Sequence, residues 1–318
     1  MATLRVFAAR DAFKHHTQYP IIARFPINHK YYSTPKIKPN SKKVSPNAYL
    51  SSEPEVVEQG YLAKFKSFFN FYKNGFKQVF SNRAQAKLLL YKQKQGHQIT
   101  WREQQLIRSA AQDTKKLVPF GILVVILPEA IPFLVVGAPH MVPSTCVTPD
   151  QLLKKRTKLQ ERRDAITALA TRSTVVNPDL LSSKDFATPE RTIQAIKAHH
   201  ASFALDLLEL KPLKAYCKYM EISTLGFSGL LKKRLSHKIQ LLRSDDMLLR
   251  KEGVDHLSTA ELISANEERG MRTLNQTDAQ LRKSLQDWIA VSLFDSPPAP
   301  EVFLIVSRIF VNNIQIKA

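Results

Sequence analysis

Cysteine is scarce in this 318-residue sequence. Cys146 and Cys217 have neither a C-x-x-C partner nor histidines at metal-ligand spacing, so the sequence supports neither a disulfide scaffold nor a zinc site. A glycine-rich phosphate-binding loop is missing, as is any arrangement of nucleophile, base and orienting group. The histidine pairs at 15–16 and 199–200 fall in a predicted leader segment and on a predicted exposed helix. We therefore expect no catalytic residue, no metal and no cofactor.

Acidic residues are almost absent from the first 52 positions, which contain nine Lys and Arg but only Asp11 as an acid. The basic residues alternate with aromatic, aliphatic and hydroxyl residues, without the continuous apolar core of a secretory signal. This composition predicts a mitochondrial presequence over 1–32, followed by a linker rich in Pro, Ser and Lys over 33–58. A solvated basic tail that binds acidic partners is the alternative.

The chain as a whole has 47 Lys and Arg against 27 Asp and Glu, a formal net charge of +20. Such an excess indicates an anionic partner or an organelle address. The excess is not uniform, because residues 178–318 contain nineteen basic and seventeen acidic residues. With 44% hydrophobic residues, the chain can form one or two packed domains.

Long apolar runs are also rare. The exception is residues 117–136, a run of twenty residues that contains a single charge. A helix of that length spans about 30 Å, the thickness of a hydrocarbon core. Lys115 and Lys116 precede it, and a basic cluster over 154–163 follows, which favours a membrane span over a buried core helix. We predict one transmembrane helix with the C-terminal part in the matrix, although Arg102 and Arg108 dilute the charge asymmetry.

The single charge in this run is Glu129, which lies between Pro128 and Pro132. A carboxylate at mid-membrane must be protonated, paired or turned to a protected interior, and the two prolines free backbone carbonyls near it. Two interpretations stay open: Glu129 relays protons or cations, or it pairs with a basic residue of a partner helix. Because one span cannot enclose a pathway, transport would need a homo-oligomer or another subunit.

The rest of the chain has helical periodicity with little β-branched alternation. Residues 59–116 are predicted to form amphipathic pre-membrane helices, the first with an aromatic face and the second starting at the Thr100–Glu103 capping box. The spacing Thr148 to Gln151 predicts a basic helix over 149–171, and Thr188-Pro189 starts another. An apolar helix over 302–316 is expected to pack into the bundle. The fold class is therefore all-α.

An internal duplication follows between 210 and 292. Leu213, Ile222, Gly226, Leu231 and Leu235 align with Leu262, Met271, Asn275, Leu281 and Leu285. Gly and Asn both accept a left-handed backbone, so each copy is predicted to be a helix, a turn and a second helix. The unit resembles a SAP-type module, a kind that often contacts nucleic acid.

Charge separates the two copies. Residues 211–243 contain eight basic residues and one acid, whereas 244–295 contain six and ten. We expect the first copy to meet phosphate, although a solvated lysine-rich helix face would have the same composition. The candidate contacts with nucleic-acid phosphates are Lys214, Lys218, Lys232, Lys233, Arg234 and Lys238.

An ordered series of motifs then resembles a known family. Around the apolar run it comprises Gly96-x-x-Ile99-Thr100-x-x-Glu103, Leu117-Val118-Pro119-Phe120, Pro128-Glu129 and Met141-x-Pro143-Ser144-Thr145. Further on it includes Asp245, Asp246, Gly253, Arg269, Gly270, Arg272, Trp288 and Arg308, which we take as structural motif residues. From about 65 to 312, the chain is similar to the leucine-zipper and EF-hand-containing transmembrane (LETM) family of the mitochondrial inner membrane.

The resemblance implies a single-pass inner-membrane protein whose residues 137–318 form a ribosome-binding-like matrix domain, with a fold compared to 14-3-3-like helical bundles. It implies contact with mitochondrial ribosomes, through rRNA or a ribosomal protein, in support of membrane-protein biogenesis and potassium/proton homeostasis. The alternative is a direct component of a K⁺/H⁺ antiporter that uses Glu129. The expected partners are the ribosome, inner-membrane lipids and a second copy of the chain. Because no Asp-x-Asp-x-Asp-Gly loop occurs, we expect a short member without an EF-hand tail and without a calcium site.

Overall fold

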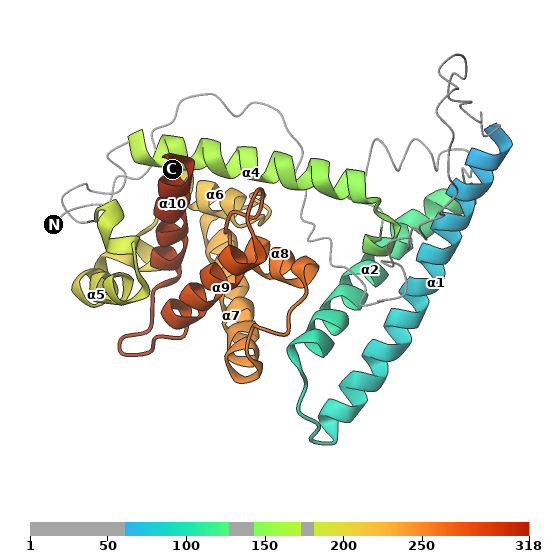
Figure 1. The fold of residues 1–318 in the computed structure, drawn as a ribbon, viewed down its shortest axis with the longest axis horizontal. Helices are drawn as coiled ribbons and strands as arrows, with labels where there is room; N and C mark the ends of the chain where they lie inside the picture. The colour runs from blue at the N-terminus through green and yellow to red at the C-terminus, as the bar shows by residue number, and fades with distance from the viewer. Residues whose placement is uncertain (1–60, 127–142, 173–180, 318) are drawn as a thin grey trace, which may run out of the picture.

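The computed structural model describes residues 61–126, 143–172 and 181–317, and Figure 1 shows that these residues form helices joined by short turns. The strand-like pairing in this part of the chain is one isolated bridge between Asp295 and Pro298. The prediction of an all-α fold is confirmed. The predicted presequence and linker lie outside the described residues, as do Pro128, Glu129 and Pro132.

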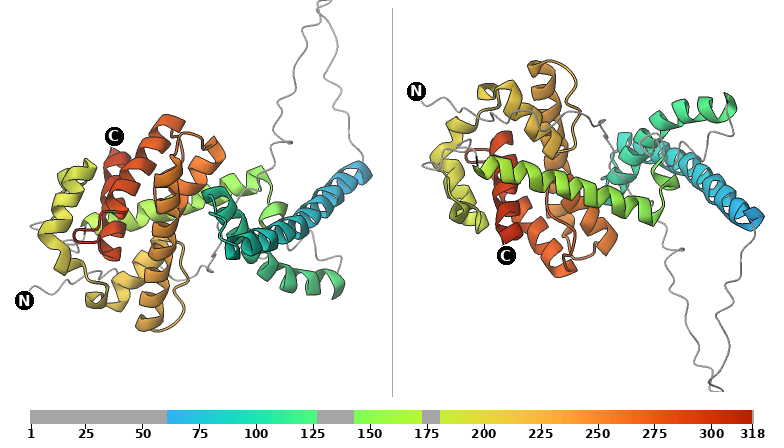
Figure 2. Two further views of the ribbon diagram at one scale, coloured as in Figure 1. Left: turned by 90° about the horizontal axis from the view of Figure 1, so that it is seen from below. Right: turned by 90° about the horizontal axis from the view of Figure 1, so that it is seen from above.

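The first two helices form an antiparallel hairpin. Helix α1 (Tyr61–Lys94) and helix α2 (Trp101–Ile126) run side by side, to one side of the remaining helices (Figure 2). Gly96, with a φ of +90°, makes the turn, and the predicted capping box starts α2: Thr100 N donates to Glu103 Oε2 at 2.9 Å.

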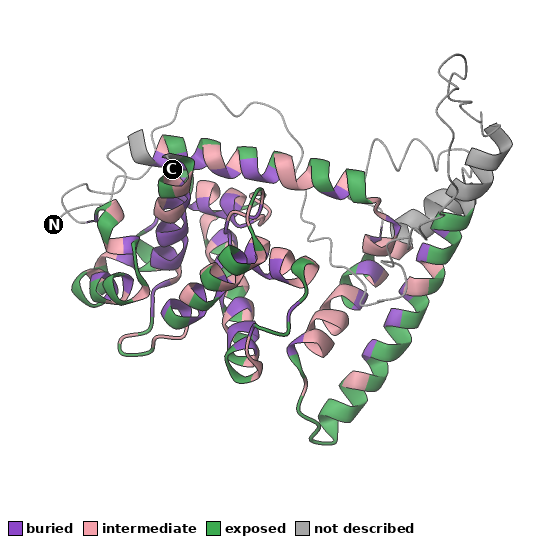
Figure 3. Cartoon of the chain, in the orientation of Figure 1, coloured by how far each residue is buried: buried purple, intermediate pink, exposed green. Residues whose placement is uncertain are grey.

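The predicted aromatic face of α1 divides into two parts. Tyr72 and Val79 are buried, whereas Phe80 is 57% exposed, and much of the outer side of α1 is exposed in Figure 3. The inner side of the helix therefore packs within the molecule, and Phe80 is a part of the predicted face that stays available to a membrane surface or a partner.

Helix α2 differs from the sequence-based boundaries. The prediction ended one helix at 116 and began a membrane span at 117, but α2 continues without a break through Ile126. Over the described residues, no helix combines the length and apolar character needed to traverse a bilayer. The second half of the predicted span lies outside those residues.

The remaining helices pack into one body (Figure 1). They are α4 (Pro149–Arg172), α5 (Pro189–His199), α6 (Leu210–Tyr219), α7 (Ser228–Glu252), α8 (Thr259–Glu268), α9 (Asp278–Ser292) and α10 (Glu301–Lys317), with the 3₁₀ turns η3 (Ser144–Cys146), η4 (Ser183–Phe186), η5 (His200–Phe203) and η6 (Leu205–Leu207). Helix α10 is the centre of the core, because residues 302–309 are all buried. The expectation that the C-terminal apolar helix packs into the bundle is confirmed.

Local capping signals start several of these helices as predicted. Thr148 N donates to Gln151 Oε1 at 3.0 Å at the start of α4, and the Thr188 hydroxyl accepts from Arg191 N at the start of α5. At the start of α8, Ser258 and Glu261 form a reciprocal capping box. Such signals need only residues three apart, so they can be found in the sequence.

The duplication is also visible in the backbone. Helices α6 and α7 form one helix-turn-helix unit, and α8 and α9 form the second. Both turns contain a Schellman motif: Ile222 N donates to Cys217 O, and Met271 N donates to Asn266 O. Gly226 and Asn275 both have positive φ, at 115° and 59°, as the alignment of the two copies predicts.

Replacing Gly270 by alanine is expected to destabilise the protein more than replacing Gly96. Each glycine has a positive φ, at +79° and +90°, in the same kind of helix-ending turn, so either alanine carries a strain of about 1–3 kcal/mol. At Gly270 the added Cβ would also lie 2.8 Å from Cε1 of Tyr219, whose hydroxyl is fixed by a 3.0 Å bond to Gly270 O. At Gly96 no atom lies within 4 Å. Overpacking should add about 1–3 kcal/mol at Gly270 alone. Denaturant unfolding measures the difference, and equal losses would argue against this close contact.

Candidate functional site

The six basic residues predicted to bind RNA lie on α6 and α7, but they are not equally accessible. Lys233 is exposed and the other five are half-buried. Arg234 is committed to the fold, because its Nη1 donates to the carbonyls of Ser223 (3.3 Å) and Leu225 (2.6 Å) in the turn. Lys232 Nζ donates to Asp206 O at 2.8 Å. Two members of the predicted set therefore fix backbone turns.

A compact group of like charges lies where α4 meets α6. Burial, together with the charges of Arg162 and Lys214, lowers the pKa of Lys218. Lys154 and Lys158 are exposed on α4, and with Arg162 they recur every four residues, which places them on one side of the helix. We call these five residues the α4/α6 basic stripe. The sequence analysis assigned the α4 cations to the flank of the membrane span, although their four-residue spacing was a signal for a shared helix face.

Two other cations of the predicted flank point into the domain. Arg163 is 2% exposed, and its guanidinium donates to Tyr219 O (3.1 Å), Glu267 O (2.8 Å) and Met271 O (3.5 Å). These carbonyls belong to the two Schellman turns, so one α4 side chain links both copies of the duplication. Arg156 Nε lies 3.5 Å from Glu267 Oε2. Both arginines serve tertiary contacts, which the sequence-based assignment to a membrane flank did not anticipate.

The motif residues after α6 form a buried polar centre. Arg269 binds Asp246 Oδ1 through Nε (2.8 Å) and Nη2 (2.6 Å), and Asp246 Oδ2 accepts from Trp288 Nε1 (2.8 Å) and Ser292 Oγ (2.6 Å). Burial opposes the charged form of Arg269, but the charges of Asp246 and Asp245 raise its pKa. Asp246 thus joins α7, α8 and α9, and its hydrogen bonds leave no room for a ligand.

Three further motif residues also have local roles. Gly253 ends α7 with a φ of +80°, and Arg272 Nη1 lies 3.4 Å from Asp164 Oδ1. Arg308 is buried on α10, with its guanidinium 5.3 Å from the centre of the Trp288 ring.

Asp245, next to Asp246, binds the helix that leads into the apolar run. It is fully buried, pairs with Arg108, and accepts from Gln104 Nε2 (3.0 Å) and Gln105 Nε2 (3.1 Å) of α2. One turn earlier, Arg102 makes a two-pronged bond to Glu261 at 2.7 and 2.8 Å. The α2 helix is therefore bound to α7 and α8 by charge-assisted hydrogen bonds.

A second buried acid joins the two ends of the segment that contains the apolar run. Asp113 of α2 accepts from Ser144 N (2.9 Å) and Ser144 Oγ (2.6 Å). Thr145 Oγ1 donates to Gly75 O at 2.9 Å, which attaches the same 3₁₀ turn to α1. The chain therefore leaves along α2 and returns beside Asp113 before α4 begins.

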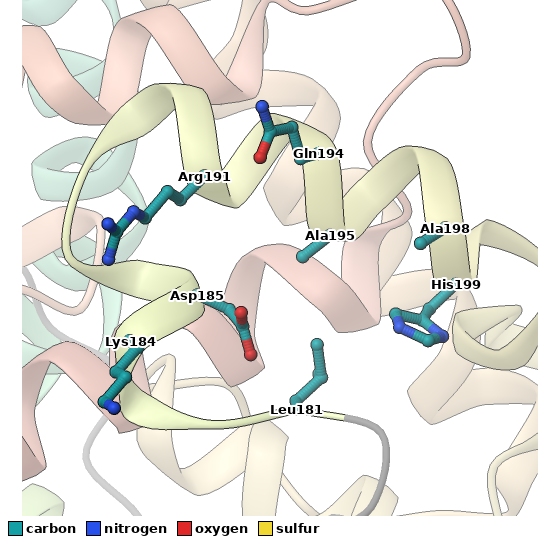
Figure 4. Close-up of a pocket in the computed structure, with 8 residues that line it drawn as sticks. All are labelled: Leu181, Lys184, Asp185, Arg191, Gln194, Ala195, Ala198 and His199. Atoms are coloured by element: carbon teal, nitrogen blue, oxygen red, sulfur yellow. The ribbon is translucent and has the colours of Figure 1, made fainter.

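A pocket of about 320 Å³ between η4 and α5 has charged walls (Figure 4). Lys184 and Arg191 lie at one end and His199 at the other, with Asp185 between them. Asp185 Oδ2 already accepts from Ser182 N at 2.6 Å, so it caps the turn rather than serving as a base for His199. Across the described ranges, no group of three or more His, Cys, Asp or Glu side chains could hold a metal.

Comparison with known proteins finds related sequences over most of this helical region. The family model described as "LETM1-like, RBD" matches residues 99–311, from the start of α2 into α10. The chain is 28% identical over 258 residues to the "Mitochondrial proton/calcium exchanger protein" of Drosophila melanogaster, covering 74% of this chain and 25% of that protein. It is also 28% identical over 244 residues to the "LETM1 domain-containing protein mdm28, mitochondrial" of Schizosaccharomyces pombe, covering 70% of this chain and 51% of that one. The chain thus spans between a quarter and half of the length of these relatives.

Proposed function

Because the chain belongs to the LETM1-like RBD family, we propose that it is a mitochondrial inner-membrane protein whose helical domain faces the matrix and binds mitochondrial ribosomes. This contact would support membrane-protein biogenesis and, through it, potassium/proton homeostasis. The role is one of binding rather than catalysis. The observation that carries the proposal is the α4/α6 basic stripe, in which Arg162, Lys214 and Lys218 lie close enough to repel one another and Lys154 and Lys158 continue along the same side of α4.

Crowded cations on a rigid surface suit a polyanion. Arg162 and Lys214 both disfavour the charge on Lys218, and a bound phosphate would relieve that repulsion. Neutralising phosphates also releases condensed counterions, so the affinity should fall steeply as salt rises. Ribosomal RNA is the polyanion that would meet such a domain in the matrix.

Charge reversal tests the stripe. The triple variant Lys158→Glu, Lys214→Glu, Lys218→Glu is expected to bind ribosomes at least about tenfold more weakly and to have a shallower salt dependence, because three phosphate contacts are lost. Cosedimentation of the detergent-solubilised full chain with mitochondrial ribosomes, over a range of salt concentrations, measures both quantities.

The matched control carries the same change of charge at the far end of α1. Lys87, Lys92 and Lys94 are exposed there, and their reversal to Glu should leave binding within about twofold if the α4/α6 stripe, rather than the net charge, is responsible. Equal losses in the two variants, or no binding by the unmodified chain even at low salt, would refute the proposed interface.

The contacts of α2 favour a different topology from the single crossing expected from the sequence. One crossing between 117 and 136 would separate residues 101–113 from residues 144–317 by about 30 Å of hydrocarbon. Asp113, however, bonds to Ser144, and Arg102 bonds to Glu261. We therefore propose that both flanks of the apolar run lie on the matrix side.

Accessibility of introduced thiols distinguishes the two topologies. Lys94 and Lys233 are exposed positions on either flank, and the native Cys146 and Cys217 are buried. In mitochondria stripped of their outer membrane, Lys94→Cys and Lys233→Cys should both resist a membrane-impermeant maleimide until detergent is added. If Lys94→Cys is labelled before detergent is added and Lys233→Cys is not, the single-pass topology is correct.

Direct ion exchange is the second candidate. The Drosophila relative is named a proton/calcium exchanger, and Glu129 is the acid within the apolar run. If this chain exchanges potassium for protons, potassium-driven proton flux in vesicles containing the purified protein should collapse in Glu129→Gln. Flux that is absent, or unchanged in this variant, would remove the role assigned to Glu129 and leave the ribosome proposal standing.

A further inference from the structure

A second pocket, distinct from the α4/α6 basic stripe, has a cavity volume of about 460 Å³. It lies between the start of α5 on one side and helices α9 and α10 on the other, and its volume is in the range of small-molecule sites. The polar part of its wall includes Thr188, Gln280, Lys283, Ser284, Arg308 and Gln315.

Arg308 is the unusual residue of this pocket. Its side chain is 6% exposed, its guanidinium lies over the Trp288 ring, and its Nε donates to Ser307 Oγ at 3.2 Å. Within the described ranges, no carboxylate lies at ion-pair distance from it. Asp287 also lines the pocket, but it is bound by Lys283 Nζ at 3.1 Å. Burial lowers the pKa of Arg308 to about 10, and the nearby Tyr219 and Asp287 offset this effect only in part.

Two other buried arginines provide a comparison. Arg269 has the carboxylate of Asp246, and Arg163 has three backbone carbonyls. In both cases, groups of the folded chain accept the hydrogen bonds of the guanidinium. Arg308 has one hydroxyl and an aromatic face, and its side chain lines both this pocket and a small adjoining cavity. A buried cation in this setting is unfavourable unless an anion joins it.

The other walls favour the same kind of ligand. Thr188 and Pro189 begin the eleven-residue helix α5 and line the pocket, and the start of a helix carries partial positive charge. Lys283 at the rim, where its side chain is 75% exposed, neutralises the carboxylate of Asp287 in the same wall. We propose that this pocket binds a small oxyanion, the phosphate or carboxylate group of a small molecule, with Arg308 as its charge partner. The proposal is independent of ribosome binding.

Binding of simple oxyanions to the full chain tests this assignment. Inorganic phosphate and succinate serve as separate probes, and their affinities are measured by calorimetry and by the rise in Tm with ligand concentration. Stabilisation by phosphate alone, by succinate alone or by both would identify the group. Arg308→Met, which keeps a long apolar side chain beneath Trp288, is expected to weaken the effective probe at least tenfold. The absence of binding by either probe would overturn the proposal.

The control is Arg272→Met. Arg272 lines only the small adjoining cavity and lies 3.4 Å from Asp164, so its loss should leave oxyanion binding unchanged. Lys283→Gln at the exposed rim preserves the fold and should weaken binding severalfold. If Arg308→Met and Lys283→Gln both bind the probe as well as the unmodified chain does, the site is not where we place it.

The stability of the ligand-free protein gives a separate readout. If Arg308 is kept for a ligand, Arg308→Met should have a Tm equal to or above that of the unmodified chain, because an uncompensated buried charge is removed. A large fall in Tm without ligand would mean that Arg308 is a structural group already satisfied by the fold, which would contradict the proposal.

Discussion

Asp246→Ala is expected to lower the free energy of unfolding by about 3–5 kcal/mol, the usual cost of removing one partner of a buried ion pair. The replacement leaves the Arg269 guanidinium buried without its carboxylate, and it removes the acceptor of Trp288 Nε1 and Ser292 Oγ. Three helices lose their common link. Chemical denaturation followed by circular dichroism measures the change.

An exposed acid of the same domain provides the control. Asp255→Ala should change the stability by less than about 0.5 kcal/mol, since the residue lies at the surface. The double variant Asp246→Leu, Arg269→Met should lose less than Asp246→Ala, because it removes both charges together. If Asp246→Ala costs no more than Asp255→Ala, the polar centre does not hold the fold as we describe.

Arg163→Leu should have the second large effect, a loss of about 3 kcal/mol or more, because hydrogen bonds from a charged donor contribute about 1.5–3 kcal/mol each. Its guanidinium binds carbonyls of both Schellman turns, so the loss should also loosen those turns. Hydrogen exchange at the amides of Ile222 and Met271, which close the turns, reports this directly.

The neighbouring residue separates stability from binding. Arg162 belongs to the α4/α6 basic stripe and is half-buried, so Arg162→Leu should weaken ribosome binding while changing the stability by less than about 1 kcal/mol. Arg163→Leu should have the opposite effects. The protein should unfold more readily, whereas its folded fraction should bind ribosomes with unchanged salt dependence. If both variants lose stability and ribosome binding to the same extent, then Arg162 does not act at a binding surface while Arg163 acts in the core.

Local signals in the sequence predicted much of the helical order. Thr100 with Glu103, Thr148 with Gln151 and Ser258 with Glu261 mark helix starts, and the structure has helices at each. The glycine at 226 and the asparagine at 275 predicted turns with positive φ, and both turns are present. In each case the interacting groups are within a few residues of one another, so their spacing along the chain is sufficient information.

The assignment of individual charges could not be made in that way. Arg162 and Arg163 are adjacent in a basic run, yet one contributes to a surface stripe and the other bonds to turns of α6 and α8. Arg102 and Arg108 seemed to weaken a topology signal, but they pair with Glu261 and Asp245. In the sequence Arg308 is one member of a series of motif residues, and only the packing of α5, α9 and α10 places it in the wall of a pocket.

The sequence by itself therefore determined the helical class, the main capping points and the duplicated unit, because these depend on periodicity and on contacts between near neighbours. The tertiary structure alone decided which cations remain at the surface, which acids bind α2 and where, among the described residues, a buried guanidinium has no carboxylate at ion-pair distance. Burial and ion pairing depend on residues that are distant in the sequence, in some cases by more than a hundred positions, as for Arg102 and Glu261, and only the folded chain brings them together.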